Sequence, residues 1–318
     1  MDHLEAWRKA SEANSVRETA RLEESRRERL IEVHGAAARF YRRELLRDKH
    51  ASARQHLESA GVRELLDPGS HWSVGYAPDS RARLTNHLRS RGFDLATVRD
   101  AGLCLLDADG RTVDRFRNQL MLPARNYRLQ ITGFVGVREG DKSPYYTATL
   151  DTLIHTRSSS LLGLAEQLDL LDGEATPILV NDPMDALAIE RLSRLSGGRW
   201  VGIPLCNMPL SGQQATMLGV RTLTDTVVVL VTDRRQARRI LSECLPELAG
   251  SFRRVQAVEL PSDQTPAVLA QAPDGLQRLH DALLLTRPLS DYQSHRRERS
   301  RGASPTAVSI EDQPGPCL

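Results

Sequence analysis

The sequence has few of the residues that mark several common protein classes. Aromatic residues make up only 4% of its 318 residues, which excludes extensive stacking of side chains on nucleobases. The four cysteines form no C-x-x-C pair, which argues against a zinc ribbon and against a disulfide framework. We therefore expect no zinc.

Long apolar runs and net charge are also missing. No apolar run is long enough to span a bilayer, and the charged N-terminus lacks the apolar segment of a secretory signal. We therefore expect a cytoplasmic protein with no membrane partner. The net charge of +2 excludes a basic field over the whole surface, so any nucleic-acid binding must rest on local patches.

The most informative stretch lies between residues 177 and 239. Apolar runs at 176–180 and 226–231 are each followed by a helical pattern, which predicts an α/β fold with a parallel sheet covered on both faces. In such sheets the functional site lies beyond the carboxyl ends of the strands. The polar residues at those ends are Asn181, Asp182, Asp185, Thr232 and Asp233.

The rest of the chain divides into segments of different character. We expect small helices and a mostly antiparallel sheet before the parallel sheet, a loop over 139–160, and a helix over 161–171. The charged first segment is either a solvated helix or an arm for DNA or a protein partner. The predicted segments are a helical arm (1–29), an α+β subdomain (30–164), a parallel-sheet domain (165–255), a small C-terminal part with a strand and helices (256–292), and a disordered tail (293–318).

Arginines recur on or between the strands predicted in the α+β subdomain. An arginine can bind a phosphate through two parallel hydrogen bonds, so several on one sheet predict a face for a nucleic-acid backbone. A solvated sheet edge is the alternative. The candidate nucleic-acid-binding residues are Arg115, Arg117, Arg125, Arg138, Lys142 and Arg157, with Arg234 at the start of a basic helix after the second strand.

Several short motifs follow one another in a fixed order along the chain. They include Val74-Gly-Tyr-Ala-Pro78, Asp114-Arg-Phe-Arg117, Gly133-Phe134-x-Gly136, Pro144-x-Tyr146 and Met184-Asp185. In this order they resemble the catalytic core of bacterial DnaG-type DNA primases. The resemblance covers about residues 30–290 and implies an N-terminal α/β subdomain, a Toprim domain, a small helical C-terminal part, and single-stranded DNA as a partner. It does not include the zinc ribbon or the helicase-binding domain of that family.

The sequence departs from that family at the catalytic acids. Asn181 stands where the resemblance implies a glutamate, and Val231 stands at the first position of an expected Asp-x-Asp, which leaves Asp233. Nucleotidyl transfer needs Mg²⁺, which carboxylates usually hold. We expect Asp185 and Asp233, with Asp182, to bind Mg²⁺ weakly at most.

Three hypotheses follow from these residues. The chain is a primase-like protein that binds single-stranded DNA or a replication partner and has weak or no primer synthesis. Alternatively, it is a divergent but active Mg²⁺-dependent primase. The third hypothesis is an interaction scaffold from a mobile element, which would bind a protein partner and show no salt-dependent DNA binding.

Overall fold

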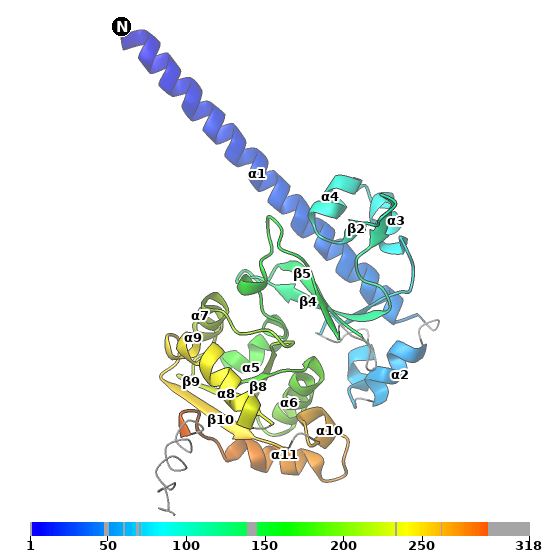
Figure 1. The fold of residues 1–318 in the computed structure, drawn as a ribbon, viewed down its shortest axis with the longest axis vertical. Coiled ribbons are helices and arrows are strands. Elements are labelled where there is room, and N and C mark those ends of the chain that lie inside the picture. Colours follow the sequence, from blue (N-terminus) through cyan, green and yellow to red (C-terminus); the bar gives the residue numbers. More distant parts are fainter. Residues whose placement is uncertain are drawn as a thin grey trace, which may run out of the picture.

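The body of the protein contains an antiparallel sheet and, next to it, a parallel sheet covered by helices (Figure 1). The computed structural model describes residues 2–47, 51–59, 61–67, 70, 72–138, 145–232, 234–261 and 263–291. The predicted disordered tail lies outside these residues. The mixture of helices and sheets confirms the predicted α/β class. Within the described residues, no helix is long and apolar enough to cross a membrane.

The charged N-terminal segment and the amphipathic segment after it form one helix, α1 (Asp2–Leu45). Its first half projects away from the body (Figure 1). From Leu30 onward one face is buried, with Leu30, Val33, Ala37 and Tyr41 at helical spacing. That face packs on the antiparallel sheet and holds the second half of the helix in place.

The N-terminal subdomain contains a four-stranded antiparallel sheet in the order β1-β4-β5-β6. The sequence predicted a loop over 139–160, and this is wrong for β6, a three-residue edge strand that is too short to show a periodic pattern. A hairpin with a turn at Gly110 forms a separate two-stranded sheet. The elements are α2 (Ala51–Ser59), β1 (Gly75–Ala77), α3 (Arg83–Ser90), α4 (Leu95–Asp100), β2 (Cys104–Leu106), β3 (Thr112–Asp114), β4 (Gln119–Arg125), β5 (Ile131–Val137) and β6 (Tyr146–Ala148), with 3₁₀ turns at Arg63–Leu66 and Arg157–Ser159.

The two faces of the four-stranded sheet contribute to different cores. Met121 and Phe134 pack in the core that includes α1. Leu122 and Val135 pack in a second core, which also contains Met184 of the following domain. Because this second core draws on both parts of the chain, the two sheets are joined through shared apolar burial.

The parallel sheet has the order β11-β10-β9-β7-β8, and only β11 is antiparallel. Helices α5, α7, α8 and α9 supply the core on one face, and α6, α10 and α11 supply the core on the other. The elements are α5 (Leu168–Asp172), β7 (Thr176–Val180), α6 (Pro183–Leu195), β8 (Trp200–Pro204), α7 (Gly212–Arg221), β9 (Thr226–Val231), α8 (Arg234–Glu243), α9 (Leu245–Ala249), β10 (Arg254–Glu259), α10 (Pro266–Leu269), α11 (Gly275–Leu284) and β11 (Arg287–Pro288).

Strand β8 was not predicted, although all five of its residues are buried. Gly202 and Pro204 lower the strand propensity of this short run. Gly202 is required by packing, because a Cβ there would lie 2.5 Å from the backbone of Ala186 in α6. The helix predicted over 161–171 is shorter, with a 3₁₀ turn at Ala165–Gln167 followed by α5. The segment boundary predicted after residue 255 falls inside β10, which pairs with β9.

Candidate functional site

The candidate site lies at the carboxyl edge of the parallel sheet, where β7 and β9 are neighbours. From β7 the chain leads through α6 to β8 on one side, while β9 lies on the other side, so a crevice opens between the two strand ends. A pocket of about 440 Å³ occupies this position. Its floor is apolar, and its polar rim is formed by Asn181, Asn207, Thr232, Arg239 and Glu243.

Asn181, at the position of the expected glutamate, shapes the loop after β8. Its side-chain Oδ1 accepts a hydrogen bond from the backbone N–H of Asn207 at 2.8 Å. Its carbonyl oxygen accepts another from the N–H of Cys206 at 2.9 Å. Cys206 and Asn207 both have left-handed backbone, with φ of 52° and 61°. The amide of Asn181 therefore holds a turn that glycine would adopt more readily.

Asp182 connects the two sheets. It is the N-cap of α6, and its Oδ1 accepts from the N–H of Met184 at 2.8 Å. Its Oδ2 accepts from the hydroxyl of Tyr146, on β6, at 2.7 Å. Burial, together with the nearby Asp182 carboxylate, raises the pKa of Tyr146. Tyr146 is therefore protonated at neutral pH, and its hydroxyl donates the hydrogen bond to Asp182.

Asp185 points to the start of α10 and is buried. Its Oδ1 accepts from the N–H of Ala267 at 3.0 Å. Burial raises the pKa of Asp185 to about 6, the hydrogen bonds from Ala267 and Thr265 oppose that rise, and the charge of Asp182 adds to it. Asp185 therefore caps a neighbouring helix, a tertiary role that the sequence did not predict.

We expect Asp185→Asn to change the free energy of unfolding at pH 7 by less than about 1 kcal/mol, since an amide oxygen can still accept from Ala267. Asp185→Ala leaves that N–H unpaired, so we expect a loss of about 1–3 kcal/mol. Urea unfolding of the two variants and the wild type, with and without Mg²⁺, measures both effects. If Mg²⁺ stabilises the wild type but not Asp185→Asn, Asp185 is a metal ligand and its role is not limited to capping α10.

Val231, at the other departure from the family, lies in the apolar core. It is completely buried in the cluster that contains Leu179 and Val229. Asp233 lies outside the described residues. Within the part of the chain that the structure describes, no three acidic, cysteine or histidine side chains form a group that could hold a metal ion. The binding of Mg²⁺ by Asp182, Asp185 and Asp233 stays a prediction.

Two of the predicted DNA-binding arginines have partners inside the protein. Arg125 donates from Nε to the buried Glu166 at 3.0 Å and from Nη1 to the carbonyl of Leu129 at 3.0 Å. Arg115 donates from Nε and Nη2 to the carbonyl of Ala148, at 3.1 and 2.7 Å. Arg115 therefore connects parts of the N-terminal subdomain, and Arg125 connects this subdomain to Glu166 at the start of the parallel-sheet domain.

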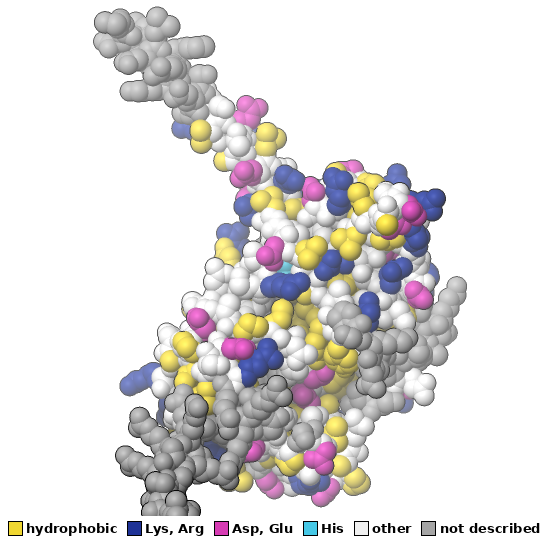
Figure 2. All heavy atoms as spheres, in the orientation of Figure 1, with side chains coloured by type: hydrophobic (Ala, Val, Ile, Leu, Met, Phe, Trp, Pro, Cys, Tyr) yellow, Lys and Arg dark blue, Asp and Glu magenta, His cyan; other side chains and the backbone are white. Residues whose placement is uncertain are grey.

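Three other arginines keep their guanidinium groups available. Arg117, Arg138 and Arg157 have no hydrogen-bond or ion-pair partner for these groups among the described residues. Arg117 and Arg138 lie near the same end of the β4–β5 pair, since Leu120 is opposite Val137. Lys142 lies outside the described residues, as does the side chain of Arg234. Basic and acidic side chains alternate over the visible face and form no continuous band (Figure 2).

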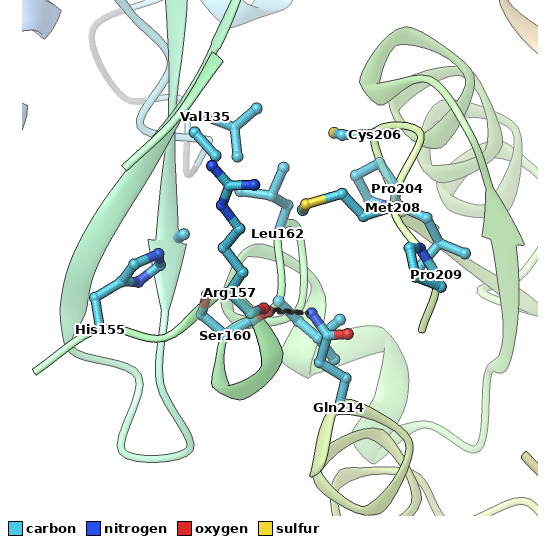
Figure 3. Close-up of a pocket in the computed structure, with 14 residues that line it drawn as sticks. Val135, His155, Arg157, Ser160, Leu162, Pro204, Cys206, Met208, Pro209 and Gln214 are labelled. Atoms are coloured by element: carbon cyan, nitrogen blue, oxygen red, sulfur yellow. Dashed lines mark hydrogen bonds between the residues drawn. The ribbon is translucent and has the colours of Figure 1, made fainter. Parts of the chain in front are cut away.

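Arg157 lies where the two sheets meet. Its side chain points between Val135 of β5 and Met208 of the loop after β8 (Figure 3). All three line a pocket with about 30 Å³ of free volume, which is room for about two water molecules. Gln214, in the first turn of α7, donates to the carbonyls of Arg157 and Ser160 at 3.0 and 2.7 Å and fixes this segment against the parallel-sheet domain. Arg157 is thus held at the junction of the two domains.

Sequence patterns did not reveal which residues form hydrogen bonds with the predicted site residues. Tyr146 belongs to one of the family motifs but had no predicted role, and no pattern marks Glu166. Asn207 stands where the resemblance implies a glycine. For Asn207 a signal was available, because a glycine expected at this position favours a left-handed backbone. Tyr146 and Glu166 gave no local signal, because their contacts join residues 36 and 41 positions apart.

The fold and the order of the motifs are similar to those of bacterial primase catalytic cores. A family model of the DNA primase catalytic core, N-terminal domain, matches residues 40–168. The RNA polymerase domain of Mycobacterium tuberculosis primase DnaG superposes with a TM-score of 0.69 at 24% identity, covering 87% of this chain and 92% of that domain. A DnaG primase catalytic domain bound to ssDNA gives a TM-score of 0.71 at 22% identity, with 87% and 84% covered.

Among proteins with curated functions, this chain is similar to the DNA primase of Listeria innocua. The two are 30% identical over 194 residues, which is 60% of this chain and 30% of that primase. These matches confirm the resemblance to the DnaG-type catalytic core. The matched part of this chain thus spans less than a third of that relative's length.

Proposed function

We propose that the chain binds single-stranded DNA along its antiparallel sheet and contributes little or no primer synthesis. One observation carries the proposal. Among the described residues, those at the positions of the acidic motifs either accept structural hydrogen bonds or lie in the apolar core. In contrast, the guanidinium groups of Arg117, Arg138 and Arg157 have no hydrogen-bond or ion-pair partner among the described residues. The solved DnaG domain with bound ssDNA, which has the same fold, is consistent with this proposal.

The chemistry of the site supports weak or absent catalysis. An amide at position 181 carries no charge and cannot accept a proton from a hydroxyl group. Asp182 and Asp185 already accept hydrogen bonds from Tyr146 and Ala267, so a metal ion would have to compete with these donors. Nucleotidyl transfer relies on metal ions to neutralise the charge that develops on phosphate oxygens.

Binding of a labelled oligothymidine, measured by fluorescence anisotropy at several salt concentrations, tests the DNA-binding part. We expect Arg117→Ala/Arg138→Ala/Arg157→Ala to weaken binding at least about tenfold and to reduce the slope of log K against log salt by about 2, since each phosphate contact on a single strand contributes about 0.7. Arg253→Ala is the matched control. This exposed arginine precedes β10 and so lies at the opposite edge of the parallel sheet.

A primer-synthesis assay on a single-stranded template, with Mg²⁺ and Mn²⁺ tested separately, addresses catalysis. We expect no primer from the wild type. Primer formation that Asp233→Ala abolishes would establish a divergent active primase. A lack of salt-dependent DNA binding by the wild type, together with a stable protein partner in a pull-down, would favour the interaction scaffold.

A further inference from the structure

A third pocket lies on the N-terminal subdomain and shares no lining residue with the two pockets at the parallel sheet. Its volume is about 480 Å³, within the range of small-molecule sites. Its floor is small and apolar. The residues that line it are Gly35, Ala36, Ala38, Arg39, Arg42 and Arg43 of α1, Ser70, Ser73, His87 of α3, Arg91 and Ile131.

The charged residues that line this pocket are all positive. Four of its lining residues are arginines, and no described lining residue is acidic. Arg39, Arg42 and Arg43 follow the i, i+3, i+4 spacing and so project from one face of α1. Like charges at this spacing destabilise a helix, which makes the arrangement costly unless an anion or the protein itself offsets the repulsion.

Only part of that charge has a partner. Arg42 donates to the carbonyls of Leu65 and Val74 at 2.6 and 3.1 Å, which anchors the loop before β1. Arg43 donates to Nε2 of His87 at 2.9 Å. Within the described chain, the guanidinium groups of the exposed Arg39 and Arg91 have no hydrogen-bond or ion-pair partner.

The surrounding groups leave the positive charge in place. A nitrogen that accepts from Arg43 must be unprotonated, so His87 is neutral. Burial, followed by the charges of Arg43 and Arg91, lowers the pKa of His87. Glu44, the carboxylate that acts on His87, is itself buried and is bound by Arg47 and Arg83 at 2.8 and 3.1 Å.

We propose that this pocket binds a phosphate group, held by Arg39 and Arg91, of a free nucleotide or of a nucleic-acid strand. Guanidinium groups match the oxygens of a phosphate in pairs, and the hydroxyls of Ser70 and Ser73 add two neutral donors. The apolar floor leaves room for the part of the ligand that the phosphate carries. The site does not depend on the DNA-binding surface proposed above.

Calorimetric titration with inorganic pyrophosphate, ATP and an oligothymidine tests the pocket. We expect Arg39→Gln/Arg91→Gln to weaken binding of at least one of these ligands by about tenfold or more. Arg89→Gln, at an exposed arginine of α3 that does not line the pocket, should change it less than about twofold. Both changes are at exposed side chains, so thermal melting should stay within a few degrees of the wild type.

The ligands separate the two sources of phosphate. Loss of pyrophosphate and ATP binding identifies a nucleotide site, and loss of oligothymidine binding alone identifies a strand contact. The Arg117→Ala/Arg138→Ala/Arg157→Ala variant should bind pyrophosphate and ATP as the wild type does, and its loss of oligothymidine binding should add to that of Arg39→Gln/Arg91→Gln. The pocket and the antiparallel-sheet surface can therefore fail independently. Equal affinities of Arg39→Gln/Arg91→Gln and Arg89→Gln for all three ligands would overturn the proposal.

Discussion

Replacing Gly202 with alanine is expected to lower the free energy of unfolding by about 3 kcal/mol, at the upper end of what overpacking a core produces. The added Cβ would lie 2.5 Å from both the Cα and the carbonyl oxygen of Ala186. These are backbone atoms of a buried helix, so no side chain can rotate to make room. Helix α6 must move away from β8, and it carries Asp182 and Asp185 with it.

Gly35→Ala is the matched control for this substitution. Gly35 lies within α1, and the nearest atom to an added methyl group would be the Nη1 of Arg39 at 3.5 Å, an ordinary contact. Alanine should raise stability there by up to about 1 kcal/mol through its helix propensity. Urea unfolding followed by circular dichroism measures both. A loss below about 1 kcal/mol for Gly202→Ala would show that β8 and α6 separate easily.

Acidification from pH 6.5 to pH 4 is expected to destabilise the protein through two buried histidines. Burial lowers the pKa of His34 and of His155 from 6.5 to about 4. In that interval the unfolded chain binds protons that the folded chain does not, so stability falls as the pH falls. The difference corresponds to about 3 kcal/mol for each histidine by pH 4.

Neighbouring groups modify this acid sensitivity in both directions. Asp151 raises the pKa of His155 and Arg157 lowers it, but burial is the largest cause. Asp185 acts in the opposite sense to the histidines. Its folded pKa of about 6 lies above the ordinary value of 3.8, so the penalty for burying its charge is relieved as the pH falls below 6.

The variant His34→Leu separates the contributions. Nδ1 of His34 lies 2.7 Å from the carbonyl of Leu30, while its Nε2 is buried with no partner among the described atoms, so leucine removes the titrating group at a modest loss. Urea midpoints measured from pH 7 to pH 4 should then fall about half as steeply as in the wild type. An unchanged slope would assign the acid sensitivity to other groups.

Sequence patterns predicted the elements that are uniformly buried or strictly periodic. The runs at 176–180 and 226–231 are continuous because both faces of the parallel sheet are covered, and α1 shows its buried face from Leu30 onward. Strand β8 was not predicted because it contains Gly202, a residue with low strand propensity that is required by the close approach of the Ala186 backbone in α6. Local sequence could place Asp185 near a strand end but could not reveal its contact with Ala267, 82 positions away. Likewise, nothing near Arg125 indicates that Glu166 would neutralise it.

The structural roles of Asn181, Asp185 and Val231 also limit which substitutions the fold tolerates at these positions. A Val231→Asp reversion would place a carboxylate at a fully buried position among apolar side chains, and an unpaired buried charge is strongly destabilising. Asn181→Glu would remove the amide that holds the turn at Cys206 and Asn207. Each of these two substitutions toward the acidic motif therefore lowers the free energy of unfolding unless a bound metal ion compensates for the loss. The requirements of a stable fold are enough to account for Asn181 and Val231, so these residues are no measure of catalytic activity.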